Sequence, residues 1–263
     1  MYRNAALMIA LFSLAGPLLK LSANAEESGG GSAAGAHWGT GNGTLHLIDD
    51  RGTEKHVIKL ERRTATDDPG LVVRETKAIV SRSKRVALVI DSYWDTERDG
   101  LLGGVRCFDS SGTVRWERHG IDVDRIRLSD DGETSLVVTR NEDGCSPVED
   151  TSCTVSAQVL DGRGKELFDF GPFTSINGYV LSRNGRFGWI SAWEKGGAVY
   201  VFFNAAKGVV TKKKASEIPG GPQLGEDGIV KLVKNVYDFK ASPEPTGGPK
   251  IRRVDVLGVL DLR

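Results

Sequence analysis

Short runs rich in β-branched and aromatic residues alternate with small polar turns along residues 44–263. The runs are four to about ten residues long, and no stretch of this part of the chain keeps a helical period. The pattern therefore predicts an all-β domain. We expect strands at residues 44–48, 55–60, 75–80, 86–93, 104–108, 113–118, 125–128, 135–140, 155–160, 166–170, 179–181, 187–193, 198–203, 209–213, 223–224, 229–239 and 252–262.

Two kinds of turn separate these runs and follow one another in strict alternation. The first is clearest at residues 128–132, Leu-Ser-Asp-Asp-Gly, with variants at residues 80–84, 181–185 and 224–228. The second is an Asp-x-x-Gly turn at residues 48–52, 108–112 and 160–164, with a divergent copy at 203–208. Asp, Ser and Asn hydrogen-bond to nearby backbone, and Gly accepts the positive φ of a tight reversal. Two alternating turns predict a repeated hairpin unit.

The spacing of the turns indicates the architecture. The serine of the first turn recurs as Ser81, Ser129 and Ser182, with Gly225 in the equivalent place, at intervals of 48, 53 and 43 residues. Such a period, with about four short strands per unit, is typical of propeller blades. We predict a small β-propeller of four four-stranded antiparallel blades. The first hairpin and the last unit are incomplete, so we expect the N- and C-terminal strands to pair and close the ring.

Two alternatives to this closure follow from the same pattern. If the termini pair differently, a fifth, partial blade results. If the ring stays open, exposed edge strands would make the protein aggregate or dimerise.

The turns also resemble those of known propeller families. Residues 107–116 read Cys-Phe-Asp-Ser-Ser-Gly-Thr-Val-Arg-Trp and resemble the repeat of pyrroloquinoline-quinone-type propellers. The Leu-Ser-x-x-Gly turns are similar to those of tryptophan-aspartate and periplasmic TolB-type propellers. The Trp116 position becomes Phe168 and then Lys212 in the following copies, so the Trp signature does not repeat. The resemblance implies a propeller fold and gives no support for a quinone or other cofactor.

Composition agrees with a globular domain and narrows the choice of partners. The 263 residues are 39% hydrophobic and 27% charged, with 33 glycines, which suits many tight turns. The 35 Lys and Arg residues balance 35 Asp and Glu residues, so the overall charge does not indicate nucleic acid or an anionic membrane as a partner. The chain has no nucleophile-elbow, phosphate-loop or zinc-helix motif.

The amino-terminal residues predict export. A basic start, an apolar run over residues 5–19 and an Ala-Asn-Ala end indicate a signal peptide, residues 1–25, cleaved after Ala25. An uncleaved anchor is the alternative, although the run is short for a membrane span. Residues 26–43 are rich in Gly, Ser and Ala and are expected to form a flexible leader. The propeller would occupy residues 44–263, in the periplasm or outside the cell.

Three cysteines fit an exported protein. Cys145 and Cys153 flank a short polar loop, and we expect a disulfide between them in an oxidising compartment. Cys107 lies in an apolar run and is expected to be a small buried hydrophobe.

Acidic residues gather in two loops that occupy the same place in successive units. Residues 95–100 resemble the opening of a calcium loop, but the twelfth position is Arg106, so we expect a solvated loop without metal. Both loops join the second and third strands of a unit and should lie on one face. That acidic face would contain Asp95, Glu97, Asp99, Glu142, Asp143, Glu149 and Asp150.

A polar cluster is expected to open on the same face. It consists of His119, Asp122, Asp124 and Arg125, the residue types that acid–base chemistry would need. A single His beside carboxylates is more often a surface or structural group. Trp94, Trp189 and Trp193 follow strand ends, where they would either pack in the core or provide an aromatic contact face.

These observations favour an exported, non-enzymatic module that binds an envelope or extracellular protein or peptide through the acidic face. An enzyme or a carbohydrate or small-ligand binder using the central funnel is the alternative, and it would need convergent titratable groups in a cleft. A third possibility is a structural part of an envelope assembly, which would leave an apolar or edge-strand patch uncovered. Oligomeric state is left open by the sequence.

Overall fold

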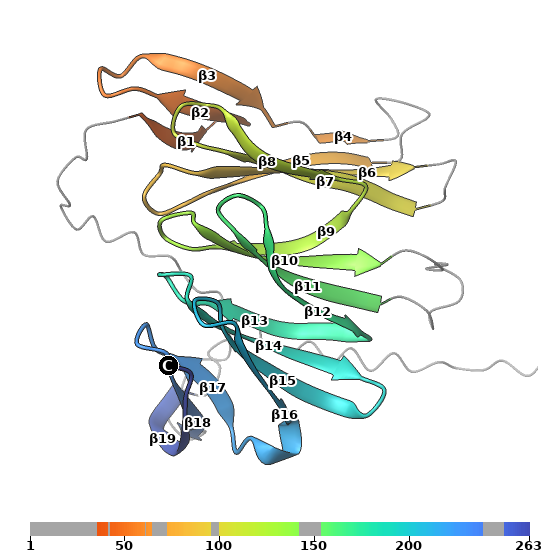
Figure 1. Cartoon of the computed structure of the whole chain (residues 1–263), viewed down its shortest axis with the longest axis vertical. Coiled ribbons are helices and arrows are strands. Elements are labelled where there is room, and N and C mark those ends of the chain that lie inside the picture. The colour runs from red at the N-terminus through yellow and green to blue at the C-terminus, as the bar shows by residue number, and fades with distance from the viewer. Residues whose placement is uncertain are drawn as a thin grey trace, which may run out of the picture. The chain divides into compact units, whose positions relative to one another are not determined.

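The computed structural model describes residues 36–41, 43–60, 62–64, 73–95, 100–141, 154–238 and 250–263. Apart from one short 3-10 helix at Ala215–Glu217, the elements in these ranges are β-strands. They form five antiparallel sheets, which follow one another in chain order (Figure 1). The predicted all-β fold built from repeated small sheets is confirmed.

The sheets are numbered in chain order. Sheet 1 contains β1 (His37–Gly41), β2 (Thr44–Ile48) and β3 (Glu54–Lys59). Sheet 2 contains β4 (Arg62–Thr64), β5 (Val73–Val80), β6 (Ala87–Asp95), β7 (Gly100–Phe108) and β8 (Val114–His119). Sheet 3 contains β9 (Asp122–Leu128), β10 (Thr134–Asn141), β11 (Thr154–Asp161) and β12 (Glu166–Phe173). Sheet 4 contains β13 (Ser175–Leu181), β14 (Phe187–Glu194), β15 (Gly197–Asn204) and β16 (Val209–Lys214). Sheet 5 contains β17 (Gly221–Leu224), β18 (Ile229–Asp238) and β19 (Lys250–Asp261).

The start of the domain differs from the prediction. Residues 37–41 were assigned to the flexible leader, but they form β1, which pairs with β2 from His37 opposite Ile48 to Gly41 opposite Thr44. Trp38 explains the difference, because its side chain is fully buried and its ring nitrogen donates to the carbonyl oxygen of Asp109 at 2.8 Å. One deeply buried aromatic side chain outweighs the weak strand preference of the glycines around it. The first described strand therefore begins seven residues before Thr44.

The expected closure is not found among the strand pairings of the described residues. β1 pairs with β2, and β19 pairs with β18, so each terminal sheet is built from its own strands. The count of five sheets matches the alternative in which the two ends do not share a blade.

Neighbouring sheets are held together by four clusters of buried apolar side chains. Sheets 1 and 2 share a cluster around Trp38 and Phe108, and sheets 2 and 3 share one around Leu88 and Ile126. Sheets 3 and 4 share the largest, which includes Leu136, Ile190 and Phe203. Sheets 4 and 5 share a cluster around Phe202, Val230 and Leu232. The core is therefore distributed between sheets rather than gathered in one centre.

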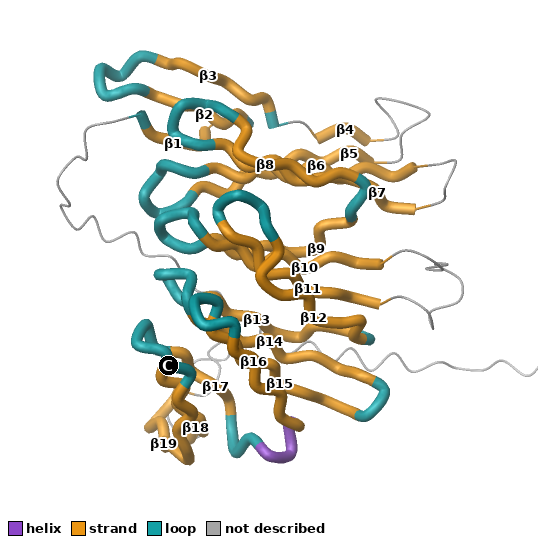
Figure 2. The backbone as a smooth tube through the Cα atoms, in the orientation of Figure 1, coloured by secondary structure: helices purple, strands orange, loops and turns teal. Residues whose placement is uncertain are grey.

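Turns of the first kind are linked to one another by hydrogen bonds. Within each turn the serine hydroxyl oxygen accepts from a backbone N–H five residues later, as Ser129 does from Thr134 at 3.0 Å. Between turns, the Ser83 N–H donates to the Asp130 carbonyl oxygen at 2.8 Å, and the Asp130 N–H donates to the Arg183 carbonyl oxygen at 2.7 Å. The sequence continues into sheet 5, where the Glu226 carboxylate accepts from the Arg183 N–H at 3.0 Å. These turns lie at one end of the sheets, shown in teal in Figure 2.

Three of these turns need glycine for two reasons, whereas the first turn has Lys84 at the equivalent position, with a φ of 59°. Gly132 has a φ of 81°, and a Cβ there would lie 2.4 Å from Cβ of Val86 in the preceding sheet. Val86 lies five positions after Ser81, the serine of the preceding turn. The turn glycines at two more interfaces face the residue in the same position relative to the preceding serine. The further pairs are Gly185 with Thr134 and Gly228 with Phe187.

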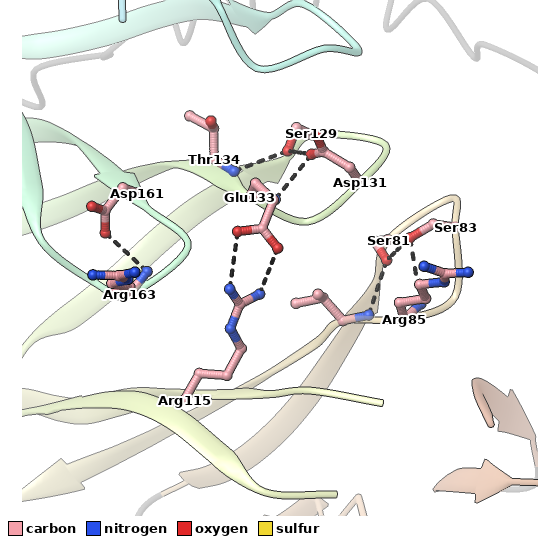
Figure 3. Close-up of polar contacts among 11 residues, drawn as sticks. Ser81, Ser83, Arg85, Arg115, Ser129, Asp131, Glu133, Thr134, Asp161 and Arg163 are labelled. Atoms are coloured by element: carbon pink, nitrogen blue, oxygen red, sulfur yellow. Dashed lines mark hydrogen bonds and ion pairs between the residues drawn. The ribbon is translucent and has the colours of Figure 1, made fainter. Parts of the chain in front are cut away.

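A bidentate ion pair reinforces the same end of sheets 2 and 3 (Figure 3). Arg115 on β8 donates from both terminal nitrogens to the two carboxylate oxygens of Glu133, each at 2.9 Å. Hydrogen bonding to Glu133 raises the pKa of Arg115, which burial alone would lower. A Cβ on Gly162 would lie 2.1 Å from the Glu133 carboxylate, so a larger residue there would displace this ion pair.

Candidate binding site

An open hollow of about 570 Å³ lies along β5 of sheet 2, β9 of sheet 3 and β13 of sheet 4, and Thr40 of β1 also lines it. Ile79 on β5 and Ile126 on β9 contribute apolar surface, while Lys77, Asp124 and Tyr179 add charged and aromatic groups. The hollow therefore combines apolar surface with both signs of charge, as ligand sites do.

Asp124 is the centre of an ion-pair network at this hollow. Arg125 donates from Nε to one oxygen of Asp124 at 2.8 Å, and Arg140 on β10 donates to the other oxygen at 2.6 Å. A second nitrogen of Arg140 lies 3.8 Å from the carboxylate of Asp122, whose side chain is only 2% exposed. Arg140 is the strand partner of Asp122, and Asp124 lies in the β-bulge that follows, so a single arginine faces both carboxylates. Such mutual pairing holds the charged groups in fixed positions.

Tyr179 fixes the opposite side of the network. The guanidinium carbons of Arg125 and Arg127 lie 5.9 and 5.4 Å from the centre of the Tyr179 ring. Cation–π contacts of this kind connect β9 of sheet 3 with β13 of sheet 4. The hollow thus presents a preorganised set of side chains rather than loose surface groups.

His119 forms an ion pair with Glu117, which is not a member of the expected polar cluster. Its Nε2 lies 3.4 Å from a carboxylate oxygen of Glu117, and its side chain is 71% exposed. Asp122, Asp124 and Arg125 do come together, and they do so with Arg140. The hypothesis of acid–base chemistry by His119 with these aspartates therefore gains no geometric support.

Most of the acidic loop residues lie outside the described residues. Asp95 is the last residue of β6, whereas Glu97, Asp99, Glu142, Asp143, Glu149 and Asp150 fall in ranges that the structure does not describe. The same is true of Cys145 and Cys153, so their disulfide stays a prediction. The strands that carry the two loops occupy equivalent places, since β6–β7 and β10–β11 are the second and third strands of their units. Figure 1 shows β6 and β10 running in the same direction, as the acidic-face prediction requires.

Trp193 lies at the corresponding end of sheet 4. It precedes the β14–β15 turn and its side chain is 50% exposed, which is unusual for so large an apolar group. Trp189 instead packs against Tyr200, with ring centres 6.0 Å apart. Of the alternative roles weighed for these tryptophans, a contact face suits Trp193 and core packing suits Trp189.

Sequence reasoning did not find Lys77, Arg140 and Tyr179 as members of the site. They come from three different sheets, and none belongs to a recognisable motif. Their only sequence signal is a polar or aromatic residue within an otherwise apolar strand. Such a signal becomes meaningful only when the packing of the sheets is known.

Two further properties of the described residues concern membranes and metals. No helix within the described ranges has the length and hydrophobicity to cross a membrane. Nor do three or more His, Cys, Asp or Glu side chains gather there as a metal site would require.

Comparison with known proteins finds similarity at the level of structure only. No protein-family model and no curated protein matches the sequence. The β-propeller domain of the Trilobed protease from Pyrococcus furiosus is 14% identical, with 64% of this chain and 51% of that chain covered and a TM-score of 0.40. TolB from Acinetobacter baumannii is 14% identical, with 83% and 46% covered and a TM-score of 0.36. An oligogalacturonate lyase in complex with manganese is 12% identical, with 79% and 57% covered and a TM-score of 0.41. In all three cases this chain spans less than two thirds of the other chain's length.

Proposed function

We propose that this chain is an exported, non-enzymatic interaction module that binds a peptide segment of an envelope or extracellular protein. The observation that carries the proposal is the hollow of about 570 Å³ along β5, β9 and β13, with Asp124, Arg125 and Tyr179 fixed beside apolar surface. An extended peptide presents exactly such a mixture, since its backbone is polar and its side chains alternate in direction. The fixed ion pairs would supply polar partners, and Ile79 and Ile126 would accept an apolar side chain.

The acidic face would extend the contact area beyond the hollow. In this proposal Asp95, Glu97, Asp99, Glu142, Asp143, Glu149 and Asp150 steer a basic partner toward the loop end of the sheets. Trp193, which is half exposed at that end, would contribute an aromatic anchor.

Selection from a random peptide library displayed on phage tests the proposal. The wild type should enrich a consensus peptide, and Asp124→Asn with Arg125→Gln should weaken its binding at least tenfold, as measured by calorimetry. Lys195→Gln, in an exposed turn of sheet 4, is the matched control and should bind like the wild type. Failure to enrich any peptide, or equal binding by all variants, would contradict the proposal.

A second variant tests the acidic face separately. Replacing Asp95, Glu97, Asp99, Glu142 and Asp143 by Ala should slow association with a basic peptide and remove most of its salt dependence. An unchanged association rate would confine the site to the hollow. If a glycan array instead yields a ligand whose binding depends on Asp124, the carbohydrate alternative replaces the peptide.

A further inference from the structure

Among the described strands, the final one, β19, has a partner on one edge only. It runs from Lys250 to Asp261, twelve residues, and pairs with β18 on one side. Sheets 3 and 4 have four strands, whereas sheet 5 has three, and no described strand occupies the position beyond β19. Figure 1 shows β19, in the violet of the C-terminal end, beside β18. A long edge strand with unpaired backbone groups is a template for pairing with another strand.

The same strand carries an unusual amount of exposed apolar surface. Val254, Val256, Leu257 and Val259 are 46%, 55%, 46% and 58% exposed. They are four of the ten large hydrophobic side chains that are exposed in the described part of the chain. Isolated exposed apolar residues need no explanation, but four on one open edge strand indicate an interaction site.

We propose that β19 pairs antiparallel with β19 of a second copy of this chain, which makes the protein a two-fold symmetric dimer. The two three-stranded sheets would then join into one sheet of six strands. Like other two-fold contacts, this one requires each strand to be complementary to itself.

Symmetry restricts the register of this pairing. In an antiparallel ladder, hydrogen-bonded and non-hydrogen-bonded residue pairs alternate. A two-fold axis relates each residue pair to a pair of the same kind. An axis midway between two adjacent pairs would relate pairs of different kinds, so the axis must lie at the centre of a pair formed by one residue and its own copy. Residues 253–256 form the stretch of β19 without a bulge at this end, opposite Val236, Asn235, Lys234 and Val233 on β18. The axis is therefore expected at one of these four positions.

Charge selects among the four positions. An axis at Arg253 or Asp255 would place like charges directly opposite each other, which is unfavourable. An axis at Val256 would pair Arg253 and Asp255 with apolar residues. An axis at Val254 places Arg253 opposite Asp255 of the second copy, twice in each dimer. These two side chains already share one face of the strand, with Nε of Arg253 3.0 Å from the Asp255 carboxylate in the same chain.

The apolar residues fit the same register. Val254 and Val256 lie on the face opposite Arg253 and Asp255, because side chains alternate along a strand. With the axis at Val254, the two copies of Val254 meet directly and each Val256 lies diagonally across from the other copy's Val254. Four exposed valines would thus be covered together.

Charge reversal gives a sharp test of the pairing. Sedimentation equilibrium should show a dimer for the wild type and at least tenfold weaker self-association for Arg253→Asp and for Asp255→Arg alone. An equimolar mixture of these two variants should recover dimerisation, because each then meets opposite charges in the other. The double variant Arg253→Asp/Asp255→Arg should also recover it. Lys195→Asp, in an exposed turn, is the control for a change of net charge and should dimerise like the wild type.

A crosslink provides an independent test that does not depend on charge. Val254→Cys should form an intermolecular disulfide on mild oxidation, whereas Val256→Cys should not, because only position 254 meets its own copy directly. A wild type that stays monomeric at all concentrations would overturn the proposal and favour closure of the ring within one chain. A dimer unaffected by charge reversal, or one crosslinked at position 256, would overturn the register.

Discussion

Glycine in the first kind of turn sets how closely one sheet approaches the next. At Gly132 an alanine would meet both an unfavourable φ and the side chain of Val86 in the preceding sheet. We expect Gly132→Ala to lower the free energy of unfolding by about 3 kcal/mol, through backbone strain and overpacking together. Gly208→Ala is the matched control, because Gly208 has a φ of 67° but no atom within 4 Å of the added Cβ. Equal losses in denaturant titrations of the two variants would mean that the contact with Val86 has no energetic role.

Asn204 shows why one turn of the second kind departs from the Asp-x-x-Gly pattern. Its amide nitrogen donates to the carbonyl oxygen of Leu262 at 2.7 Å, and the residue is only 2% exposed. A carboxylate cannot donate this bond, so asparagine replaces the aspartate found at Asp49, Asp109 and Asp161. The change from Asp to Asn in this turn is therefore explained by a hydrogen bond that links sheet 4 to the C-terminal residues after β19.

The variant Asn204→Asp should accordingly destabilise the protein by about 2 kcal/mol near neutral pH, since two acceptors would face each other in a buried site. Burial would raise the pKa of the new carboxyl, so its contribution is most favourable at low pH and is lost as pH rises. The loss of stability should therefore be smaller at pH 4 than at pH 7 in thermal unfolding. Asp161→Asn is the reciprocal control: its Oδ1 accepts from two backbone N–H groups, and the amide oxygen can still do so. A pH-independent effect at position 204 would contradict this account.

Cysteine reactivity tests two expectations at once. Cys107 is buried, and this burial raises the pKa of its thiol to about 12. If Cys145 and Cys153 are also bridged, the native protein should show no thiol reactive toward a disulfide reagent at pH 8. If Cys145 and Cys153 are bridged, unfolding without a reductant should expose one thiol, and unfolding with a reductant should expose three. Three reactive thiols without a reductant would exclude the disulfide.

At the scale of elements, the sequence predicted most strands because turn chemistry and strand pattern are local. The Ser and Asp turns place the ends of β5 to β16 within a few residues of the prediction. β1 was missed because its stability comes from Trp38, which packs against Phe108 some seventy residues further along the chain. β4, three residues long, has no pattern of its own and exists by pairing with β5.

The link between sheets 4 and 5 gives a prediction at this scale. The Glu226 carboxylate accepts from the backbone N–H groups of Arg183 and Asn184 at 3.0 and 3.3 Å. Glu226→Ala should speed hydrogen exchange in β17 and β18 several-fold while leaving β9 to β12 unchanged. Glu217→Ala, an exposed residue of the short helix, is the control. Faster exchange throughout the molecule would show that the Glu226 hydrogen bonds stabilise all the sheets and not sheet 5 alone.

At the scale of the whole molecule, stability is expected to follow the order of the sheets. Each cluster of buried side chains joins sheets that are neighbours in the chain, and the largest joins sheets 3 and 4. Folds with such nearest-neighbour contacts open from their ends. In dilute denaturant, hydrogen exchange should therefore reach β1–β3 and β17–β19 before β9–β16. Simultaneous exchange of all sheets would contradict this and would favour a closed ring.

The candidate site could be predicted only in part at this scale. Asp122, Asp124 and Arg125 were found because they are close in sequence at the start of one strand. Arg140 was not, because its place opposite Asp122 depends on the pairing of β9 with β10, and Tyr179 was not, because its place depends on how sheets 3 and 4 pack. The predicted closure is not found among the pairings of the described strands, and a local pattern carries no information on which strand ends meet.

The rule that each turn glycine contacts the residue five after the preceding serine has a consequence for how this chain can change. The contact is made in the same way at three interfaces with different partners: Val86, Thr134 and Phe187. A repeat such as residues 129–181 therefore contacts the repeats before and after it through the same kind of turn contact. This holds even though its side chains differ from those of its neighbours. Duplicating that segment in tandem would lengthen the molecule by one blade and would require no new kind of contact.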